Sequence, residues 1–337
     1  MILVTGGTGL LGSHLLFELI RLGKPVRALK RERSDTSMVH KIFAYYLPDP
    51  DESFRKIEWV DCDLLDFTAL EDALDGVSEI YHCGGMVSFH PKDHPLMLKV
   101  NIEGTANLVN LSFEKKIRKF LYVSSIATLG RNNSAGFTDE ESYWKTSVKN
   151  TTYAISKYGG EREIWRGMEE GLNAVIVNPS VILGPGFWDG NSGLFTLLQK
   201  GLKYYPKGLN GYVDVKDVVK SMILLMDGNI VNERFIINSE NVSYRQLFTW
   251  IAEHLRKPAP SIYVSPALSQ LAWRIEAVRS FITHSRPNLT KEMAITASQE
   301  YLYKNDKIRK ALGVGFIPVE ESVKDTCRIF LEDQQKN

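Results

Sequence analysis

Tyr153 and Lys157 are the residues of this sequence whose types and spacing best suit proton transfer. They close the run Tyr153–Lys157 (YAISK), and in a helix a spacing of four places both side chains on one face. A free tyrosine has a pKa of about 10, and a lysine ammonium one turn away favours the phenolate. Ser125, 28 residues earlier, can hold the same substrate oxygen through its hydroxyl. The spacing therefore predicts acid/base chemistry at a carbonyl or alcohol oxygen.

A glycine-rich turn near the N-terminus predicts a nucleotide site. The run Thr5–Gly12 (TGGTGLLG) follows an apolar segment and precedes a pattern in which Leu11, Leu15 and Leu19 are four apart. A strand, a tight turn and a helix fit this order, and the helix N-terminus then offers N–H groups to a pyrophosphate. The cofactor contacts expected from this turn are Gly6, Thr8, Gly9, Leu10 and Gly12.

The residues after the second expected strand bear on which nucleotide binds. A ribose 2′-hydroxyl usually meets an Asp or Glu at this place, whereas a 2′-phosphate needs cations. The chain has Lys30 and Arg31 there, with Arg33 two residues on and no acidic residue at the strand's end. The sequence therefore favours NADP, bound by Lys30 and Arg31, and leaves NAD open.

Two further strand ends are expected to line the same cofactor. Asp61–Leu64 (DCDL) follows the third expected strand, and a carboxylate there can accept the adenine amino group. Cys83–Gly85 ends the fourth strand, where small residues let ribose and diphosphate lie against bare backbone. Because ligands bind along the carboxyl edge of open α/β sheets, we expect Asp63, Leu64, Gly84 and Gly85 in the site.

These residues need a parallel sheet to position them, and residues 1–180 have its pattern. Short β-branched runs alternate with longer helical ones, which predicts an α/β fold with a Rossmann-type, doubly wound parallel sheet and helices on both faces. The expected strands are Ile2–Thr5, Val26–Leu29, Ile57–Asp61, Glu79–Cys83, Phe120–Ser124 and Ala174–Asn178. The expected helices are Leu10–Leu22, Leu96–Lys115 and Thr152–Gly171.

Residues 181–337 predict a smaller α+β lobe for the substrate. Glycine-rich loops and short strands replace the earlier pattern, and we expect Tyr212–Met226 and Arg234–Ile237 to return to the sheet domain. Helices are expected at Asp217–Met226, Ser243–Leu255, Pro266–Ile282 and Glu320–Asp333. One apolar stripe is interpreted as lobe core, with an interfacial membrane helix as the alternative: Leu268, Leu271, Ala272, Ile275 and Val278.

The composition of the chain indicates which kinds of partner and which cellular location to expect. A formal charge of +1 gives no broad field for nucleic acid or an anionic membrane. The three cysteines lack metal-ligand spacing, so no metal site is expected. Met1–Val4 leads straight into the glycine turn without a targeting leader, and charges interrupt the most apolar later stretch. We therefore expect a cytoplasmic protein with a small-molecule carbonyl or alcohol substrate.

With these motifs in place, the chain resembles an extended short-chain dehydrogenase/reductase of the NAD-dependent epimerase/dehydratase superfamily. The resemblance spans essentially the whole chain and is greatest to the dihydroflavonol-4-reductase and 3-beta-hydroxysteroid-dehydrogenase-like branch. The runs that carry it are Thr5–Gly12, Asp63–Leu64, Tyr122–Ser125 (YVSS), Val100–Thr105 (VNIEGT), Tyr153–Lys157, Asn178–Gly186 (NPSVILGPG) and Tyr212–Asp217 (YVDVKD).

The resemblance implies a role for each matched residue. Tyr153 would be the acid/base, Ser125 would orient the carbonyl, and Lys157 would tune Tyr153 and bind ribose. Val123, Pro179 and Val181 would contact the cofactor, the last two beside the nicotinamide carboxamide. Gly84-Gly85 stands where the family usually has alanines. The helices around Leu96–Lys115 and Thr152–Gly171 resemble those that form a homodimer interface, which would bury Leu108 and Ile164 between subunits.

Three functions remain open at this stage. The first is an NADP-dependent carbonyl reductase or alcohol dehydrogenase. The second is a nucleotide-sugar epimerase on the same scaffold, although Lys30 and Arg31 argue against the NAD that epimerases usually prefer. The third is a regulator that senses NADP without catalysis, and the presence of Ser125, Tyr153 and Lys157 argues against it.

Overall fold

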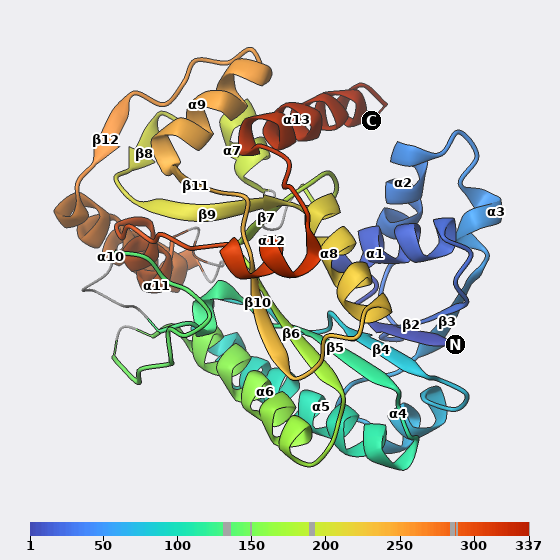
Figure 1. Cartoon of the computed structure of the whole chain (residues 1–337). Helices are drawn as coiled ribbons and strands as arrows, with labels where there is room; N and C mark the ends of the chain where they lie inside the picture. Colours follow the sequence, from blue (N-terminus) through green and yellow to red (C-terminus); the bar gives the residue numbers. More distant parts are fainter. Residues whose placement is uncertain (131–135, 149, 189–192, 284–286, 288, 337) are drawn as a thin grey trace.

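A seven-stranded parallel sheet forms the centre of the molecule in the computed structural model (Figure 1). Its strand order is β10-β6-β5-β4-β1-β2-β3, and every neighbouring pair is parallel. The order reverses between β1 and β4, which is where open α/β sheets bind ligands. The strands are β1 (Ile2–Thr5), β2 (Val26–Lys30), β3 (Ile57–Asp61), β4 (Glu79–His82), β5 (Lys119–Val123), β6 (Ala174–Pro179) and β10 (Glu233–Ile237).

Helices cover both faces of this sheet, as expected for a doubly wound fold (Figure 1). Alternate strand residues enter two cores: Leu3 and Ile80 face one, whereas Val4 and Tyr81 face the other. The first core is covered by α4 (Phe67–Ala73), α5 (His94–Glu114) and α6 (Thr152–Glu169). The second is covered by α1 (Leu10–Arg21), α2 (Ser37–Tyr46) and α8 (Val215–Asp227).

The expected strands and helices of the first half are confirmed closely. All six strands lie within one residue of their expected ends, and the three helices within two. The structure adds three helices that the sequence did not indicate, namely α2, α3 (Asp51–Phe54) and α4. Thr36 is the residue before α2, but its side chain makes no capping hydrogen bond to that helix. The structure describes residues 1–130, 136–148, 150–188, 193–283, 287 and 289–336.

The second half builds two small sheets and a third apolar core. β7 (Val181–Leu183), β9 (Leu209–Asp214) and β11 (Glu240–Ser243) form one sheet, and β8 (Tyr204–Pro206) pairs with β12 (Ile262–Val264). The four expected helices are present, and Ser243 Oγ caps α9 by accepting from Gln246 N–H. The remaining elements are α7 (Gly193–Gln199), α9 (Tyr244–His254), α10 (Pro266–Thr283), α11 (Lys291–Ala297), α12 (Asp306–Leu312), α13 (Val319–Lys336) and the 3₁₀ turns η1 (Pro91–Asp93) and η2 (Ile126–Thr128).

The apolar stripe of α10 is not lobe core, so that interpretation was wrong. Leu268, Leu271, Ile275 and Val278 are 47–61% exposed, whereas Ser269 on the opposite side is buried. A helical period shows which side chains share a face, but it does not show which way that face turns. None of the described helices is long and apolar enough to cross a membrane.

The expected exposure of Leu108 and Ile164 to a partner subunit was also wrong. Both side chains are fully buried in this chain's own core, because α5 and α6 pack against each other. A homodimer stays a prediction, but these two residues cannot form its interface.

Candidate active site

The turn after β1 is built for close approach by a ligand. Gly6 has a φ of +68°, and a Cβ on Gly12 would lie 2.2 Å from Gly6 O, so helix α1 packs directly on the turn. Gly9 precedes α1, and among the described residues no side chain caps this helix and no acid lies in its first turn. The amide donors around Thr8 and Leu10 therefore suit the diphosphate of a dinucleotide.

A buried chain of hydrogen bonds holds Gly84 beside this turn. Thr5 Oγ1 accepts from Gly84 N–H at 2.9 Å and donates to His82 Nδ1 at 2.6 Å. His82 Nε2 donates to Thr105 Oγ1 at 3.0 Å, and Thr105 donates to the main-chain oxygen of Asn101. Burial lowers the pKa of His82 to about 3, which keeps the ring neutral. The glycine run is thus tied to α5 through a histidine that the sequence did not single out.

Lys157 reaches under the end of β5 from helix α6. Its Nζ donates to the main-chain oxygen of Val123 at 2.7 Å, and a Cβ on Gly85 would lie 3.5 Å from the same atom. Lys157 is buried, and desolvation lowers its pKa to about 8 although the Glu161 carboxylate opposes the shift. The structure therefore brings Lys157, Val123 and Gly85 together.

Ser125 and Tyr153 meet at the same edge. Thr151 caps α6 by accepting from Ala154 N–H at 3.1 Å, which places Tyr153 in the first turn of the helix. Burial raises the pKa of Tyr153, and the nearby Ser125 hydroxyl lowers it in part. The ring of Phe89 lies 6.2 Å from that of Tyr153, between centroids. These two hydroxyls and the Lys157 ammonium form one constellation.

A buried carboxylate supports this constellation and was missed in the sequence. Glu161 Oε2 accepts from Ser124 Oγ at 2.6 Å and Thr128 Oγ1 at 2.8 Å, and Oε1 pairs with Arg234 Nη1 at 3.1 Å. Asn178 Nδ2 donates both to this carboxylate and to the main-chain oxygen of Ser125. The available signal was the position of Glu161, one helical turn after Lys157.

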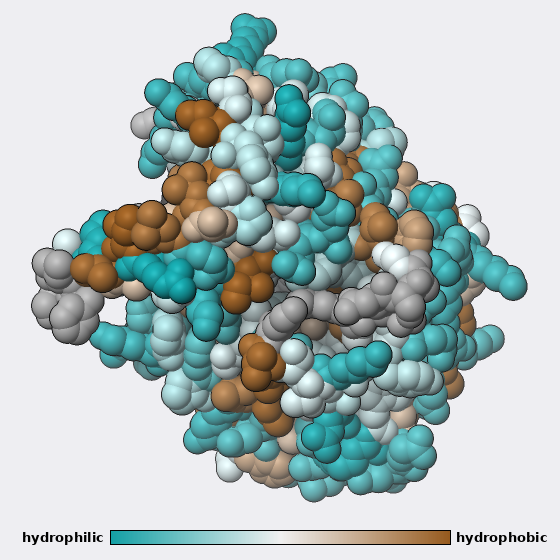
Figure 2. Space-filling view, turned by 90° about the vertical axis from the view of Figure 1, so that its left-hand side faces the viewer, coloured by the Kyte–Doolittle hydropathy of each residue, from teal (hydrophilic) through white to brown (hydrophobic). Residues whose placement is uncertain are grey.

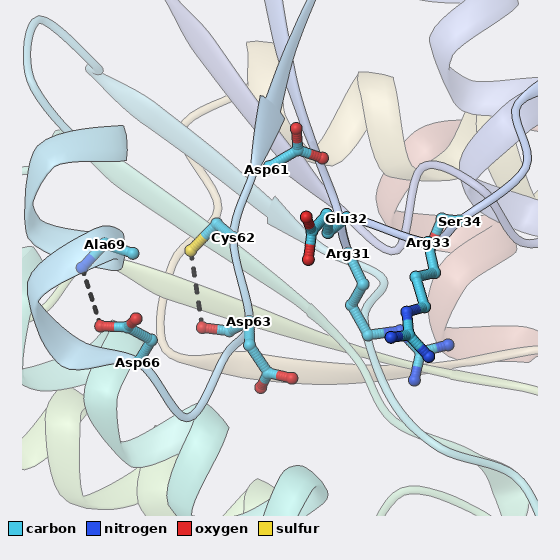
Figure 3. Close-up of a pocket in the computed structure, with 9 residues that line it drawn as sticks. All are labelled: Arg31, Glu32, Arg33, Ser34, Asp61, Cys62, Asp63, Asp66 and Ala69. Carbon is cyan, nitrogen blue, oxygen red and sulfur yellow. Dashed lines mark hydrogen bonds between the residues drawn. The ribbon is translucent and has the colours of Figure 1, made fainter.

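A cavity of about 790 Å³ lies where β2 and β3 end (Figure 3). Lys30 does not line it, because its ammonium forms an ion pair with Asp61. Arg31 and Arg33 do line it, and in the described part of the chain neither guanidinium has an ion-pair partner. The other lining residues are Glu32, Ser34, Asp61, Cys62, Asp63, Asp66 and Ala69.

The remaining expected contacts lie on either side of the site. Asp63 is partly occupied by its own turn, since Oδ1 accepts from Leu65 N–H at 2.9 Å, and the Leu64 carbonyl accepts from Asn107. Pro179 ends β6 in the core, and Val181 opens β7 at the rim of a second cavity of about 150 Å³. That cavity is lined by Val181, Ile182, Leu183, Leu194, Phe195, Tyr212, Tyr244 and Leu247.

A doubly wound sheet with a glycine-rich turn after its first strand is the arrangement that binds a dinucleotide cofactor. The family model for the NAD dependent epimerase/dehydratase family matches residues 2–237, and the chain belongs to this family. The resemblance stated from the motifs is thereby confirmed.

Individual relatives agree with this assignment. "Sterol demethylase protein B" of Methylococcus capsulatus is 30% identical over 275 residues, covering 80% of this chain and 78% of the relative. A Synechocystis relative named for dihydroflavonol 4-reductase is 28% identical over 338 residues, covering 97% and 93%. Among solved structures, the crystal structure of gox2253 is 26% identical with a TM-score of 0.82, covering 99% of this chain and 98% of that chain.

Proposed function

We propose that this protein is an NADP-dependent carbonyl reductase or alcohol dehydrogenase with Tyr153 as its general acid/base. The observation that carries the proposal is the approach of the Ser125 and Tyr153 hydroxyls to one another at the sheet edge that Lys157 reaches. A bound nicotinamide cofactor supplies the hydride. During reduction Tyr153 donates its proton to the substrate oxygen, Ser125 donates a hydrogen bond to the same oxygen, and the Lys157 ammonium stabilises the phenolate left behind.

An assay of cofactor consumption tests this function against its two alternatives. Purified protein is mixed with NADPH and a panel of ketones and aldehydes, and the absorbance of the reduced cofactor is followed. A carbonyl reductase consumes NADPH in step with alcohol formed. A nucleotide-sugar epimerase interconverts sugars without net consumption, and a sensor binds NADPH without turnover. Either of these last results would exclude the proposal.

An apolar carbonyl compound is the substrate class that the site favours. The cavity beside Val181 is lined mainly by aliphatic and aromatic side chains, and Phe89 lies beside Tyr153. A relative named for sterol demethylation also points to an apolar substrate. A panel that runs from short polar ketones to ring ketones of increasing size should give the largest kcat/KM for the larger apolar members.

Arg31 is expected to select NADP. Arg31→Ala should weaken NADP binding by roughly 1.5–3 kcal/mol, the range for a hydrogen bond to a charged group, and leave NAD binding unchanged. Lys30→Ala is the matched comparison and should cost NADP less, because Asp61 already holds that ammonium. Titration of both nucleotides against the three proteins measures this. Equal losses for NAD and NADP in Arg31→Ala would rule out a phosphate contact.

The pKa of Lys157 predicts how activity depends on pH. As the pH rises through about 8, Lys157 loses its proton and its stabilisation of the phenolate, whereas burial keeps Tyr153 protonated over the same range. We expect kcat/KM for reduction to fall above a pH of about 8. In Lys157→Arg, whose guanidinium stays charged, the residual activity should fall only at higher pH. An unchanged pH profile in that variant would contradict this role.

A further inference from the structure

Helix α10 lies on the surface with its apolar side turned outward. Leu268, Leu271, Ile275 and Val278 follow one another at intervals of three, four and three residues, so they share one face of the helix. Their exposed fractions are 47%, 53%, 61% and 59%. Figure 2 shows hydrophobic residues gathered on this side of the molecule. An ordinary surface helix packs its apolar face against the core and exposes its polar face, so the exposed apolar face of α10 indicates an interaction site.

The exposed apolar surface continues from α10 onto the paired strands β8 and β12, which come before this helix in the sequence. Tyr204 of β8 pairs in register with Ile262 of β12, and the two are 51% and 44% exposed. Tyr263 is 43% exposed, and two residues after β12 ends α10 begins. We define the apolar face as Tyr204, Ile262, Tyr263, Leu268, Leu271, Ile275 and Val278.

The segments that carry the apolar face are also strongly basic. Residues 193–210 and 244–283 contain eight lysines and arginines against two acids, whereas the whole chain has a formal charge of +1. Lys203, Arg256, Lys257 and Arg274 among them are exposed. One of the two acids, Glu276, forms an ion pair with Arg279 of the same helix. The segments that carry the apolar face are therefore much more basic than the rest of the chain.

We propose that the apolar face docks this protein on the surface of a bilayer that contains anionic phospholipids. An interfacial helix buries aliphatic side chains at the acyl boundary while neighbouring lysines and arginines meet the phosphates. Exposed tyrosines suit the headgroup level of the same interface. A second copy of the chain fits less well, because a two-fold contact through this face would bring its cations against the same cations of the partner.

Docking on this face would also bring the catalytic helix close to the membrane. Helix α10 packs on α11, and in α11 Glu292 Oε1 accepts from Thr152 N–H at 3.0 Å, next to Tyr153. An apolar carbonyl compound dissolved in the bilayer would then have a short route to the site. This last step rests on the proposed function, whereas the docking itself does not.

Flotation with vesicles tests the docking surface. The probe is vesicles of phosphatidylcholine alone or of equal parts phosphatidylcholine and phosphatidylglycerol, mixed with the full chain. We expect the wild type to float with the anionic vesicles, and Leu271→Gln/Ile275→Gln to bind at least about tenfold less. Leu22→Gln/Leu224→Gln, which changes one exposed leucine just after α1 and one on α8, is the matched control and should bind like the wild type. Added salt should weaken the wild type's binding.

Three outcomes would overturn this proposal. They are a wild type that stays below the vesicles, a Leu271→Gln/Ile275→Gln variant that floats as well as the wild type, and a dimer in solution that this variant abolishes. The last would assign the face to a second copy. Consumption of NADPH with a water-soluble carbonyl should be the same in all three proteins, so a failure of the proposed function shows itself separately. Matching thermal unfolding of the variants excludes misfolding.

Discussion

Replacing Tyr153 with phenylalanine should lower kcat by about 10²–10⁴-fold, the usual contribution of a general acid, while NADPH binding stays near the wild-type value. The phenyl ring keeps the packing of Tyr153 against Phe89 and removes only the hydroxyl that faces Ser125. The variant therefore lacks the proton donor but keeps the aromatic ring that packs beside Phe89. Single-turnover rates with NADPH, under conditions in which hydride transfer limits, measure the change directly.

Tyr158→Phe provides the control for this variant. Tyr158 lies on the same helix, where its ring stacks on Trp144 at 4.5 Å between centroids. In the described part of the chain its side chain forms no hydrogen bond with Ser125, Tyr153 or Lys157. Tyr158→Phe also removes one phenolic hydroxyl from α6, and it should leave the single-turnover rate unchanged. If Tyr153→Phe kept more than about a tenth of the wild-type rate, Tyr153 would not be the acid. Helix α6 would then serve only to support the cofactor, and a non-catalytic NADP sensor would become the better interpretation.

The central sheet could be predicted because local rules decide it. Buried parallel strands need short apolar, β-branched runs, and the helix between two of them needs one apolar stripe, so the alternation is visible in the sequence. The glycines of the nucleotide turn could be predicted for the same reason. At Gly6 the backbone has a positive φ, and at Gly12 a side chain would collide with the turn.

Long-range contacts account for the parts of the site that the sequence did not indicate. Lys30 and Arg31 stand side by side in the chain, but the register of β2 against β3 places Lys30 opposite Asp61 and so removes it from the cavity. The helical period identified which residues of α10 share an apolar side, but whether that side is buried or exposed depends on how α10 packs on α11. The pairing of β10 with β6 at the edge of the sheet is what brings Arg234 next to Glu161. None of these outcomes follows from spacing alone.

The pair of Glu161 and Arg234 leads to a large expected effect on stability. Glu161→Gln should lower the free energy of unfolding by about 3–5 kcal/mol, because it leaves the Arg234 guanidinium buried without a counter-charge. The Glu161 side chain is fully buried, that of Arg234 is 9% exposed, and the arginine also donates to the main-chain oxygen of Glu140. Arg234 therefore cannot turn to solvent to recover its hydration. Urea unfolding, followed by tryptophan fluorescence and by circular dichroism, measures the loss.

Glu163→Gln is the matched control, since Glu163 is two residues away on α6 and pairs with Arg166 at the surface. Exposed ion pairs contribute about 0.2–1 kcal/mol, so this variant should unfold almost like the wild type. The double variant Glu161→Leu/Arg234→Leu should lose less stability than its two single changes added together, because it leaves neither charge alone in the core. If Glu161→Gln cost no more than Glu163→Gln, the buried pair would not hold this edge of the sheet. The position of Ser125 would then depend on Thr128 and Asn178, which bond to its main-chain oxygen without any charge.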